Sequence, residues 1–452
     1  MASPLLTYLR SKRVLRHNAA LTRVEFEAQR LLRFRDLVRH AQAHSPYYEN
    51  IMRIQGLVAD TCIPSDFPVL TKRLLQDNFD AIVTDRRITR AGIVNFLKHS
   101  RDPEERYLDE FMVTHTSGSS GEVGYFVFSS EDWMRGAASS GRLRKRRLRR
   151  TRQAFFGATG GHFGGVSGVL SARRGIGRLF NNIEVFDINA PLAQTLERLN
   201  AFQPQVLSGY ATGAKILAQA QLDGRLRIHP ERISCGGEPL SVGDQAWLEQ
   251  VFGCPCVNAY AATETLLMGI ACRNDPGMTL FDDDLVLEPA EGHLLVTNLF
   301  NRTLPLIRYR MDDSLRLTTL TSPYGPYPVI KPVVGRTEWV PVFRNPQGEE
   351  DFISPHVINE IFIPGVWRFQ LRWMDEGSFR FAICQDPALD APERAMAVAA
   401  MEERLHEIFN QKGLGNVQFG VDVVDDIAVD PVTRKFRLVL PVAQHPAAQA
   451  LT

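Results

Sequence analysis

The sequence has few cysteines, only six in 452 residues. That number is too small for the disulfide framework of a compact secreted domain. Cys254, Cys256 and Cys272 fall near one another, but a structural zinc site needs four ligands at suitable spacing. We therefore expect the cysteines to be buried free thiols.

The chain also lacks an excess of charge and long apolar runs. Its net charge is +1, so no overall field favours nucleic acid or a membrane surface. No apolar run reaches about 18 residues, which argues against a spanning helix. Residues 1–21 mix leucines with Arg10, Lys12, Arg13 and Arg16, without the apolar core or cleavage site of an export signal. We interpret this segment as a surface helix of a cytoplasmic protein.

The middle of the chain alternates between two periodicities. Strand signals at 206–207, 233–235 and 257–260 are separated by helical spacing of apolar residues over 192–202, 214–222 and 241–252. Repeated β-α-β order predicts an α/β fold with a largely parallel sheet flanked by helices. Residues 1–110 are rich in helix formers and predict further helices.

The end of the chain has a different pattern. Apolar residues alternate over 367–373 and again over 379–383, around a turn at 375–377, which predicts a hairpin. A helix over about 391–410 and a strand over 417–423 complete a compact α+β module. Because 452 residues exceed the size of a single core, we predict a large domain over 1–335 and a small one over 336–452.

The segment Thr116-Ser117-Gly118-Ser119-Ser120-Gly121 is the most informative part of the chain. Apolar residues at 111–113 and 125–128 flank it, which predicts a strand, a tight loop and a strand. Glycine lets backbone N–H groups converge on an anion and the hydroxyls add donors, so the loop is a candidate phosphate site. It is not a Walker-A loop, because no Lys-Ser or Lys-Thr closes it. The alternative is an ordinary flexible loop.

Further motifs follow this loop at wide spacing. They are Asn258-Ala259-Tyr260-Ala261-Ala262-Thr263-Glu264, Arg308-Tyr309-Arg310-Met311-Asp312-Asp313, Gly335-Arg336-Thr337-Glu338 and Asp430-Pro431-Val432-Thr433-Arg434-Lys435-Phe436. In this order the set resembles the adenylate-forming superfamily of acyl-CoA synthetases, and most closely its phenylacetate–CoA ligase-like branch. Within that branch the chain is similar to the adenylate-forming enzymes related to deazaflavin-coenzyme adenylating synthetases.

The resemblance implies a two-step ligase that uses ATP and Mg²⁺. A carboxylic acid, aryl or fatty, would become an acyl-adenylate with release of pyrophosphate. The acyl group would then pass to a thiol, of CoA or of a phosphopantetheinyl carrier protein, or to an amine. Two other classes stay open: adenylyl transfer onto a cofactor hydroxyl, and a degenerate nucleotide-binding protein.

The resemblance also assigns roles to single residues around the phosphates and the ribose. Glu264 is the candidate Mg²⁺ ligand and Thr263 a candidate donor to the α-phosphate. Their alternative is a helix start, with Thr as the cap and Glu in the first turn. Asp313 would accept the ribose hydroxyls, or else is an acid in a surface turn. Arg336 would contact ribose or phosphate, or else form a salt bridge at a hinge.

Two further roles concern the adenine and the reaction itself. Tyr260 would stack on adenine, with Gly236, Gly237 and Glu238 walling the same pocket, or else is a buried strand aromatic. Lys435, on a small domain that moves as a lid, would bridge the carboxylate and α-phosphate oxygens as charge builds up. The alternative is a solvated lysine.

Two segments at strand ends would line the acyl pocket by the same resemblance. One is a glycine-rich loop over 157–168 and the other is the loop over 208–212. His162, Phe163, Tyr210 and Ala259 are the candidate pocket residues. The alternatives are an ordinary loop histidine and aromatic core residues.

The chain departs from the family pattern at Glu122, where the family often has Lys or Arg after the phosphate loop. The loop over 343–348 does not match the CoA-contacting loop of phenylacetate-type enzymes, so the acceptor stays open.

Basic residues crowd the segment Arg142–Arg152. This segment is either a solvated basic helix or a dock for an acyl carrier protein or the CoA 3′-phosphate. It is too isolated to indicate nucleic acid.

Overall fold

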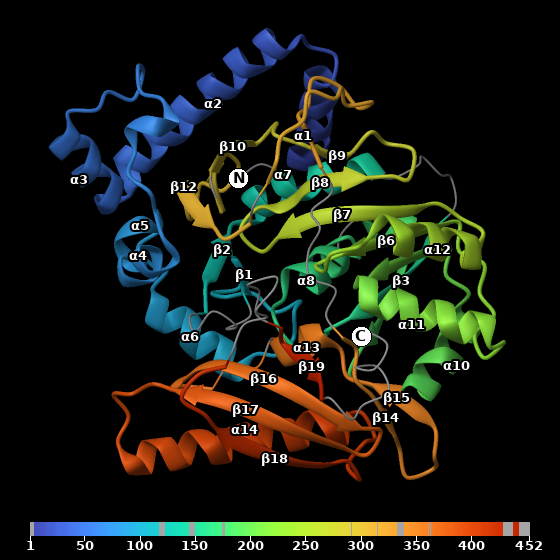
Figure 1. The fold of residues 1–452 in the computed structure, drawn as a ribbon. Coiled ribbons are helices and arrows are strands. Elements are labelled where there is room, and N and C mark those ends of the chain that lie inside the picture. Colours follow the sequence, from blue (N-terminus) through green and yellow to red (C-terminus); the bar gives the residue numbers. More distant parts are fainter. Residues whose placement is uncertain are drawn as a thin grey trace.

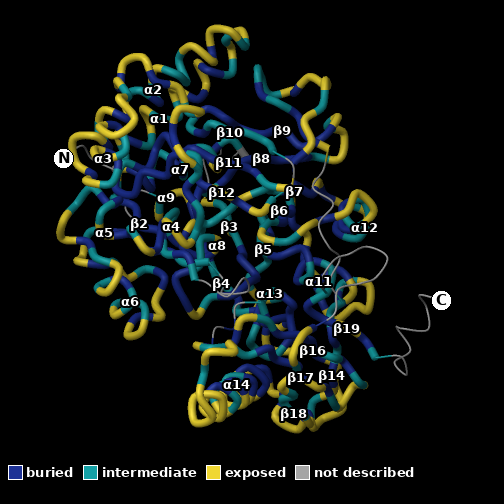
Figure 2. The backbone as a smooth tube through the Cα atoms, turned by 60° about the vertical axis from the view of Figure 1, so that its left-hand side comes forward, coloured by how far each residue is buried: buried dark blue, intermediate teal, exposed yellow. Residues whose placement is uncertain are grey.

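The computed structural model describes residues 4–116, 123–143, 150–173, 177–290, 292–313, 315–331, 339–359, 361, 363–427 and 437–442. Figure 1 shows the first N-terminal helices at one end of a central body of sheets, the following ones along one side of it, and an α+β module at the other end. Buried backbone runs through the sheets of the body, whereas the outer turns of the helices are exposed (Figure 2).

The N-terminal part is helical, as its composition predicts. A capping box begins the longest of these helices: the Thr22 hydroxyl accepts from Glu25 N and the Glu25 carboxylate accepts from Thr22 N, at 3.3 and 2.9 Å. The helices are α1 (Pro4–Asn18), α2 (Arg23–His44), α3 (Pro46–Gln55), α4 (Lys72–Asp77), α5 (Phe79–Ile82) and α6 (Arg90–His99).

The central sheet has eight strands in the order β13-β9-β8-β7-β6-β5-β3-β4. Neighbouring strands from β4 to β7 are parallel, and those from β7 to β13 are antiparallel. This confirms the predicted α/β fold with a parallel-rich sheet. The strands are β3 (Thr151–Gly157), β4 (Asn181–Asp187), β5 (Val206–Gly209), β6 (Arg232–Gly236), β7 (Cys256–Ala262), β8 (Leu266–Ala271), β9 (Met278–Leu280) and β13 (Val329–Ile330).

Helices cover both faces of this sheet because side chains alternate along its strands. On one face Phe156 of β3 joins the core under α10 (Leu192–Phe202), α11 (Ala211–Leu222) and α12 (Val242–Phe252). On the other face Phe155 packs with Val166 and Leu170 of α8 (Gly164–Ser171). The predicted glycine-rich loop is therefore wrong over its second half, because these two apolar residues, four apart, bury one side of a helix.

Smaller sheets complete the large body. β1 (Met112–His115) and β2 (Tyr125–Phe128) pair antiparallel, as predicted for the segments that flank the Ser/Gly loop. A second sheet is built from β10 (Leu285–Ala290), β11 (His293–Asn298) and β12 (Leu306–Met311), and it shares a core with α2 to α6. The helix α7 (Ser130–Ser140) contacts α1, β2 and β8, and the short helix α9 (Gly177–Phe180) contacts β4.

The C-terminal module has a sheet of its own, in the order β18-β17-β16-β19, covered by α14 (Figure 1). The predicted hairpin, helix and strand are all present. The elements are β14 (Val342–Arg344), β15 (Glu350–Phe352), α13 (Pro355–Asn359), β16 (Val366–Asp375), β17 (Ser378–Gln385), α14 (Ala391–Gln411), β18 (Gln418–Val423) and β19 (Val439–Pro441).

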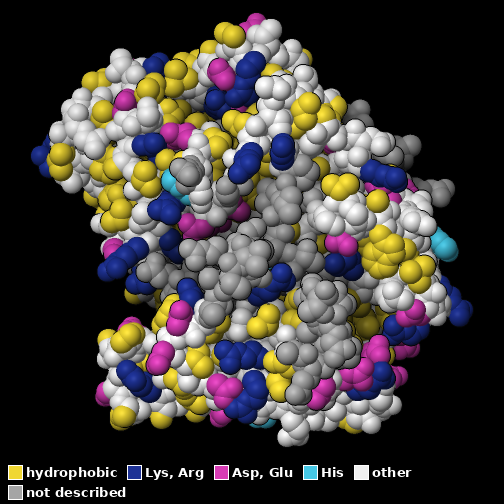
Figure 3. All heavy atoms as spheres, viewed as in Figure 1, with side chains coloured by type: hydrophobic (Ala, Val, Ile, Leu, Met, Phe, Trp, Pro, Cys, Tyr) yellow, Lys and Arg dark blue, Asp and Glu magenta, His cyan; other side chains and the backbone are white. Residues whose placement is uncertain are grey.

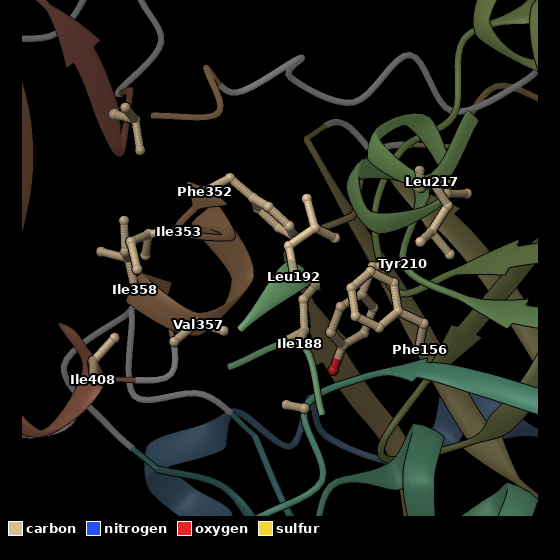
Figure 4. Packing of buried hydrophobic residues seen from close by; sticks show 14 of the residues in the cluster. Phe156, Ile188, Leu192, Tyr210, Leu217, Phe352, Ile353, Val357, Ile358 and Ile408 are labelled. Atoms are coloured by element: carbon tan, nitrogen blue, oxygen red, sulfur yellow. The ribbon is translucent and has the colours of Figure 1, made fainter. Parts of the chain in front are cut away.

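The C-terminal module docks on the large body through apolar side chains. Figure 4 shows Phe352 of the module pointing toward Leu192, which follows β4 with Ile188, while Ile353 lies beside Ile358 within the module. All belong to one continuous core cluster. Burial of this kind stabilises the docked arrangement in proportion to the apolar area removed from water.

The expectations about cysteine and charge can be compared with the structure directly. The six cysteines are free and all but Cys272 are buried, as predicted. Within the described ranges, no group of three or more His, Cys, Asp or Glu is placed to hold a metal ion. No helix of the described residues is long and apolar enough to cross a membrane. On the face seen in Figure 3, basic and acidic side chains are interspersed.

Candidate active site

A cavity of about 1360 Å³ lies against the carboxyl ends of the parallel strands. Such an edge is where ligands bind in open α/β sheets. The ends of β6 and β7 reach it with Gly236, Gly237, Ala259 and Ala261. Tyr260, between Ala259 and Ala261, is not among the lining residues, and its side chain packs against the core cluster that includes the N-terminal helices.

A tight turn between β7 and β8 carries two of the predicted residues, Thr263 and Glu264. Thr265 N donates to Ala262 O at 3.2 Å, which closes the turn, and the chain then returns as an antiparallel strand. The alternative of a helix start is therefore wrong. A Cβ added at Gly164, the first residue of α8, would lie 3.6 Å from Thr263 Cα. The turn thus lies directly beside the start of α8.

Glu264 is buried, with 7% of its surface exposed. Its backbone carbonyl accepts from Asn298 Nδ2 at 2.9 Å, which holds the turn in place. Burial raises the pKa of the Glu264 carboxyl and nearby Asp313 adds to the rise, while Lys72 opposes it. Two carboxyl groups and one ammonium group therefore share this end of the cavity.

Asp313 follows β12 and also lines the cavity. The pKa of the Asp313 carboxyl is raised, mainly by burial and further by the nearby Asp312 charge. The Tyr260 phenol opposes part of this rise. In turn, burial and the Asp313 carboxylate raise the pKa of the Tyr260 phenol. The Tyr260 phenol therefore lies near the candidate ribose ligand, and its stacking on adenine stays a prediction.

The helix α4 also contributes to the cavity, which no motif in the sequence predicts. Thr71 caps this helix by accepting from Leu74 N at 3.2 Å, and Lys72 is its first residue. Both residues line the cavity, as does Arg310 of β12. The sequence around Lys72 signals only a helix start, and nothing local indicates that this start faces a turn almost two hundred residues later.

Two further predicted residues, His162 and Glu238, are not among the lining residues of the cavity. His162 is buried, its Nε2 lies 2.9 Å from Ser100 Oγ, and burial lowers its pKa, so the ring is neutral near pH 7. The Glu238 carboxylate accepts from Thr212 N at 2.7 Å and so caps the start of α11. Neither side chain is placed to contact a ligand in the cavity.

The remaining predicted residues divide into two groups. Those that line the cavity together are Thr116, Phe163, Tyr210, Gly236, Gly237, Ala259, Thr263, Glu264 and Asp313. Those that lie outside the described residues are Ser117, Gly118, Ser119, Ser120, Gly121, Glu122, Arg336 and Lys435. The missed neighbour His115 lies with its ring centroid 4.9 Å from that of Phe163 and also lines the cavity.

The basic segment is not uniformly solvated where the structure describes it. Arg142 has only 16% of its side chain exposed, forms an ion pair with Asp283, and donates to the Tyr327 hydroxyl at 2.9 Å. Its guanidinium also lies 4.4 Å from the Phe281 ring centroid. The predicted exposed basic face is therefore wrong at Arg142, whose charge is neutralised inside the protein.

Comparison with known proteins shows which solved structures the fold is similar to. No family model matches the chain. Two solved complexes of a 2-hydroxyisobutyryl-CoA ligase match 96% of the chain and 93% of their own, with TM-scores of 0.60 and 0.56 at 18% and 17% identity. One holds 2-HIB-AMP and CoA in the thioesterification state, and the other holds R3-HIB-AMP in the postadenylation state.

The chain has the fold of the adenylate-forming acyl-CoA ligases. Its sequence is 24% identical over 311 residues to protein CapK of Staphylococcus aureus and 23% identical over 322 residues to a phenylacetate–coenzyme A ligase of Aromatoleum evansii. The matches span 63% and 66% of this chain, and 62% and 68% of the relatives' length. The resemblance that the ordered motifs indicate, to the adenylate-forming superfamily and its phenylacetate–CoA ligase-like branch, is confirmed.

Proposed function

We propose that the chain activates a carboxylic acid with ATP to an acyl-adenylate and then transfers the acyl group to the thiol of CoA. The observation that carries the proposal is the convergence of Thr263, Glu264, Asp313 and Lys72 on one cavity whose remaining walls are largely apolar. A charged end beside an apolar space suits a nucleotide joined to an organic acid. The adenylate-forming fold and the complexes of its structural relatives support the same reaction.

In the first step the carboxylate oxygen of the acid forms a bond to the α-phosphorus of ATP. The bond from that phosphorus to the bridging oxygen breaks, and pyrophosphate leaves with the electron pair. Thr263 donates to an α-phosphate oxygen, and the Lys72 ammonium balances the negative charge beside Glu264. Their contribution is positioning and electrostatic stabilisation, because two anions must approach each other.

The residues present fit a Mg²⁺ ion bound with the nucleotide. Glu264 is buried with a raised pKa, so a divalent cation is the natural partner for its charged form. Mg²⁺ in nucleotide sites takes one or two carboxylates and completes its shell with phosphate oxygens and water. Glu264 would hold the metal ion, and the metal ion would neutralise the charge of the departing pyrophosphate.

The second step needs a thiol and a rearrangement of the C-terminal module. We assign residues 1–335 to ATP and acyl binding and 336–452 to a lid that carries Lys435 for the first step. CoA is the proposed acceptor, and a phosphopantetheinyl carrier protein or an amine is the alternative. Because the Arg142 side chain points into the protein, it is not available as one of the positive charges that the segment Arg142–Arg152 would offer to an acyl carrier protein.

The decisive test is carboxylate-dependent exchange of pyrophosphate into ATP across a panel of aryl and fatty acids. We expect exchange with one class of acid, and its loss in Glu264→Gln, with the exposed Glu402→Gln as a matched control. Formation of a stable product that retains AMP on a hydroxyl would instead support adenylyl transfer. Nucleotide binding without any turnover would support a degenerate binding protein, and either result would overturn the proposal.

A further inference from the structure

The cavity extends well beyond the residues that would hold a nucleotide. Its volume of about 1360 Å³ exceeds the roughly 300–1,000 Å³ of ordinary small-molecule pockets. The additional space leads away from the turn of Thr263 between α1, α7, α8 and α9. We call this space the distal arm, and its lining includes Leu5, Leu9, Ala137, Gly168, Val169 and Phe180.

The first feature of the distal arm is its length. Its roof is α8, which begins beside Thr263, 3.6 Å from a Cβ added at Gly164. Eight helical residues rise by about 12 Å, so the arm continues over that distance from the reacting end. Gly168, one turn along, would place an added Cβ with no atom within 4 Å. Glycine is unfavourable inside a helix, and here the missing side chain leaves the arm open.

The second feature is the chemistry of its walls. α1, α7 and α9 contribute mostly aliphatic and aromatic side chains, with Ser130 and Ser140 of α7 among them, and Leu9 of α1 and Phe180 of α9 remain 52% and 46% exposed. These two large apolar groups form an apolar rim that a ligand's tail would cover. An acid no longer than a benzoate would leave both the arm and the rim in contact with water.

The floor of the arm is the face of the central sheet, and it is more polar than the roof. Two of its polar side chains are hydrogen-bonded within the sheet: Gln153 Nε2 donates to Ser208 Oγ at 3.4 Å, and that hydroxyl donates to the backbone carbonyl of Ala154 at 3.0 Å. Charged side chains also line the cavity away from the turn of Thr263: Arg232 at the start of β6, and Arg106, which donates to Ser130 Oγ of α7 at 3.2 Å. A ligand with a second carboxylate is therefore the alternative to one with an apolar tail. The experiment must distinguish between these two kinds of acid.

We propose that the acid activated here is a monocarboxylic acid with a long, flexible apolar tail, which lies along α8 and reaches the rim formed by Leu9 and Phe180. This inference rests on the proposed function and names its substrate class. The carboxylate would lie at Thr263, and the tail would follow the glycines of α8 that line the cavity, Gly164, Gly165 and Gly168. A rigid aryl acid or a short acid would fill only the first part of the space.

The first experiment compares acids in pyrophosphate exchange and, without ATP, in direct calorimetric binding to the full chain. We expect kcat/KM to rise from butanoate through octanoate to hexadecanoate, by up to about fourfold for each buried methylene. Hexadecanedioate should be weaker than hexadecanoate. A preference for benzoate, phenylacetate or butanoate, or for the diacid, would overturn the inference while leaving the adenylating activity intact.

Two variants locate the tail. Gly168→Leu should lower the ratio of kcat/KM for hexadecanoate to that for butanoate at least about tenfold, since it blocks several methylene positions. Leu9→Glu should lower the ratio of hexadecanoate to octanoate, because only the longer tail reaches the rim. Gly243→Leu, at an exposed glycine of α12 outside the cavity lining, is the matched control and should change neither ratio.

The binding measurement separates this inference from the proposed function. If no acid supports exchange but hexadecanoate binds and Gly168→Leu weakens that binding, the distal arm is supported and the proposed reaction fails. If exchange proceeds and neither variant changes the chain-length ratios, the reaction stands and the inference is wrong.

Discussion

Lys412 and Asp351 form a buried ion pair where the C-terminal module meets the large body. Lys412 Nζ lies 3.0 Å from Asp351 Oδ1, and their side chains are 1% and 7% exposed. The ammonium also donates to the carbonyls of Ile188 and Ala190 at 2.8 and 2.9 Å, and Asp351 Oδ2 accepts from Leu192 N at 2.7 Å. The pair therefore joins the end of α14 and β15 to the segment that follows β4.

Lys412→Ala should destabilise the protein by about 3–5 kcal/mol, the usual cost of removing one partner of a buried pair. The substitution leaves the Asp351 charge and two carbonyl groups without their donor. Burial lowers the pKa of the Lys412 ammonium, so the native charge is retained only because these acceptors surround it. The free energy of unfolding in urea measures the effect.

The matched control is Lys215→Ala, which removes a half-buried pair with Asp244 at 3.4 Å and should cost about 0–1 kcal/mol. The double variant Lys412→Met with Asp351→Asn should recover part of the loss, because no charge is then left buried alone. Equal destabilisation by the two alanine variants would contradict this account of the docked module.

Much of the fold could be predicted from the sequence because its cues are local. The alternation of apolar residues gives β16 and β17, and Ser241 begins α12 by accepting from Asp244 N at 2.9 Å. The motif residues Thr263 and Asp313 meet in one cavity as their order along the chain indicates. Periodicity and ordered motifs therefore carry real information about the site.

The remainder depends on contacts that no local pattern contains. Lys72 approaches Glu264 from a distant helix, and Arg142 finds Asp283 rather than solvent. His162 stands in a glycine-rich segment that resembles a loop, yet the following residues form α8 because Val166 and Leu170 bury one side. Tertiary packing decides each of these, and it overrides composition.

Glu264→Gln should stabilise the ligand-free protein by about 1–3 kcal/mol near pH 8, the scale of an uncompensated buried polar group. Burial raises the pKa of this carboxyl in the folded state. Its contribution to stability is therefore complete below its unfolded pKa and is lost as pH rises through the raised folded pKa. The free energy of unfolding in urea should therefore fall as pH rises in the wild type. The same fall should be smaller in the variant.

The same raised pKa predicts proton release when Mg·ATP binds. The metal favours the charged carboxylate, so nucleotide affinity should increase with pH through the Glu264 pKa. Calorimetry in buffers of different ionisation enthalpy measures the released protons. Release that persists undiminished in Glu264→Gln would contradict the assignment of this residue to the metal.

Lys72→Ala should lower pyrophosphate exchange roughly 10- to 100-fold, because a charge-assisted hydrogen bond contributes about 1.5–3 kcal/mol. The residue lies close enough to Glu264 to lower its pKa, so its loss should also move the acid limb of the pH–rate profile to higher pH. Lys98→Ala, at an exposed lysine of α6, is the control. A fall in rate without a shift of that limb would contradict the coupling between Lys72 and Glu264.

Lys435→Ala should reduce adenylation by roughly 10²–10³, the scale for losing one donor to a transition state. The proposed role is to neutralise charge between the carboxylate and the α-phosphate during the first step only. Transfer of a chemically prepared acyl-adenylate to CoA should therefore proceed at the wild-type rate, whereas pyrophosphate exchange should fall. The neighbouring substitution Arg434→Ala controls for general loss of positive charge. Unchanged exchange in Lys435→Ala would remove this lysine from the mechanism, and an equal loss in both half-reactions would show that it acts on the lid as a whole rather than on the phosphoryl centre.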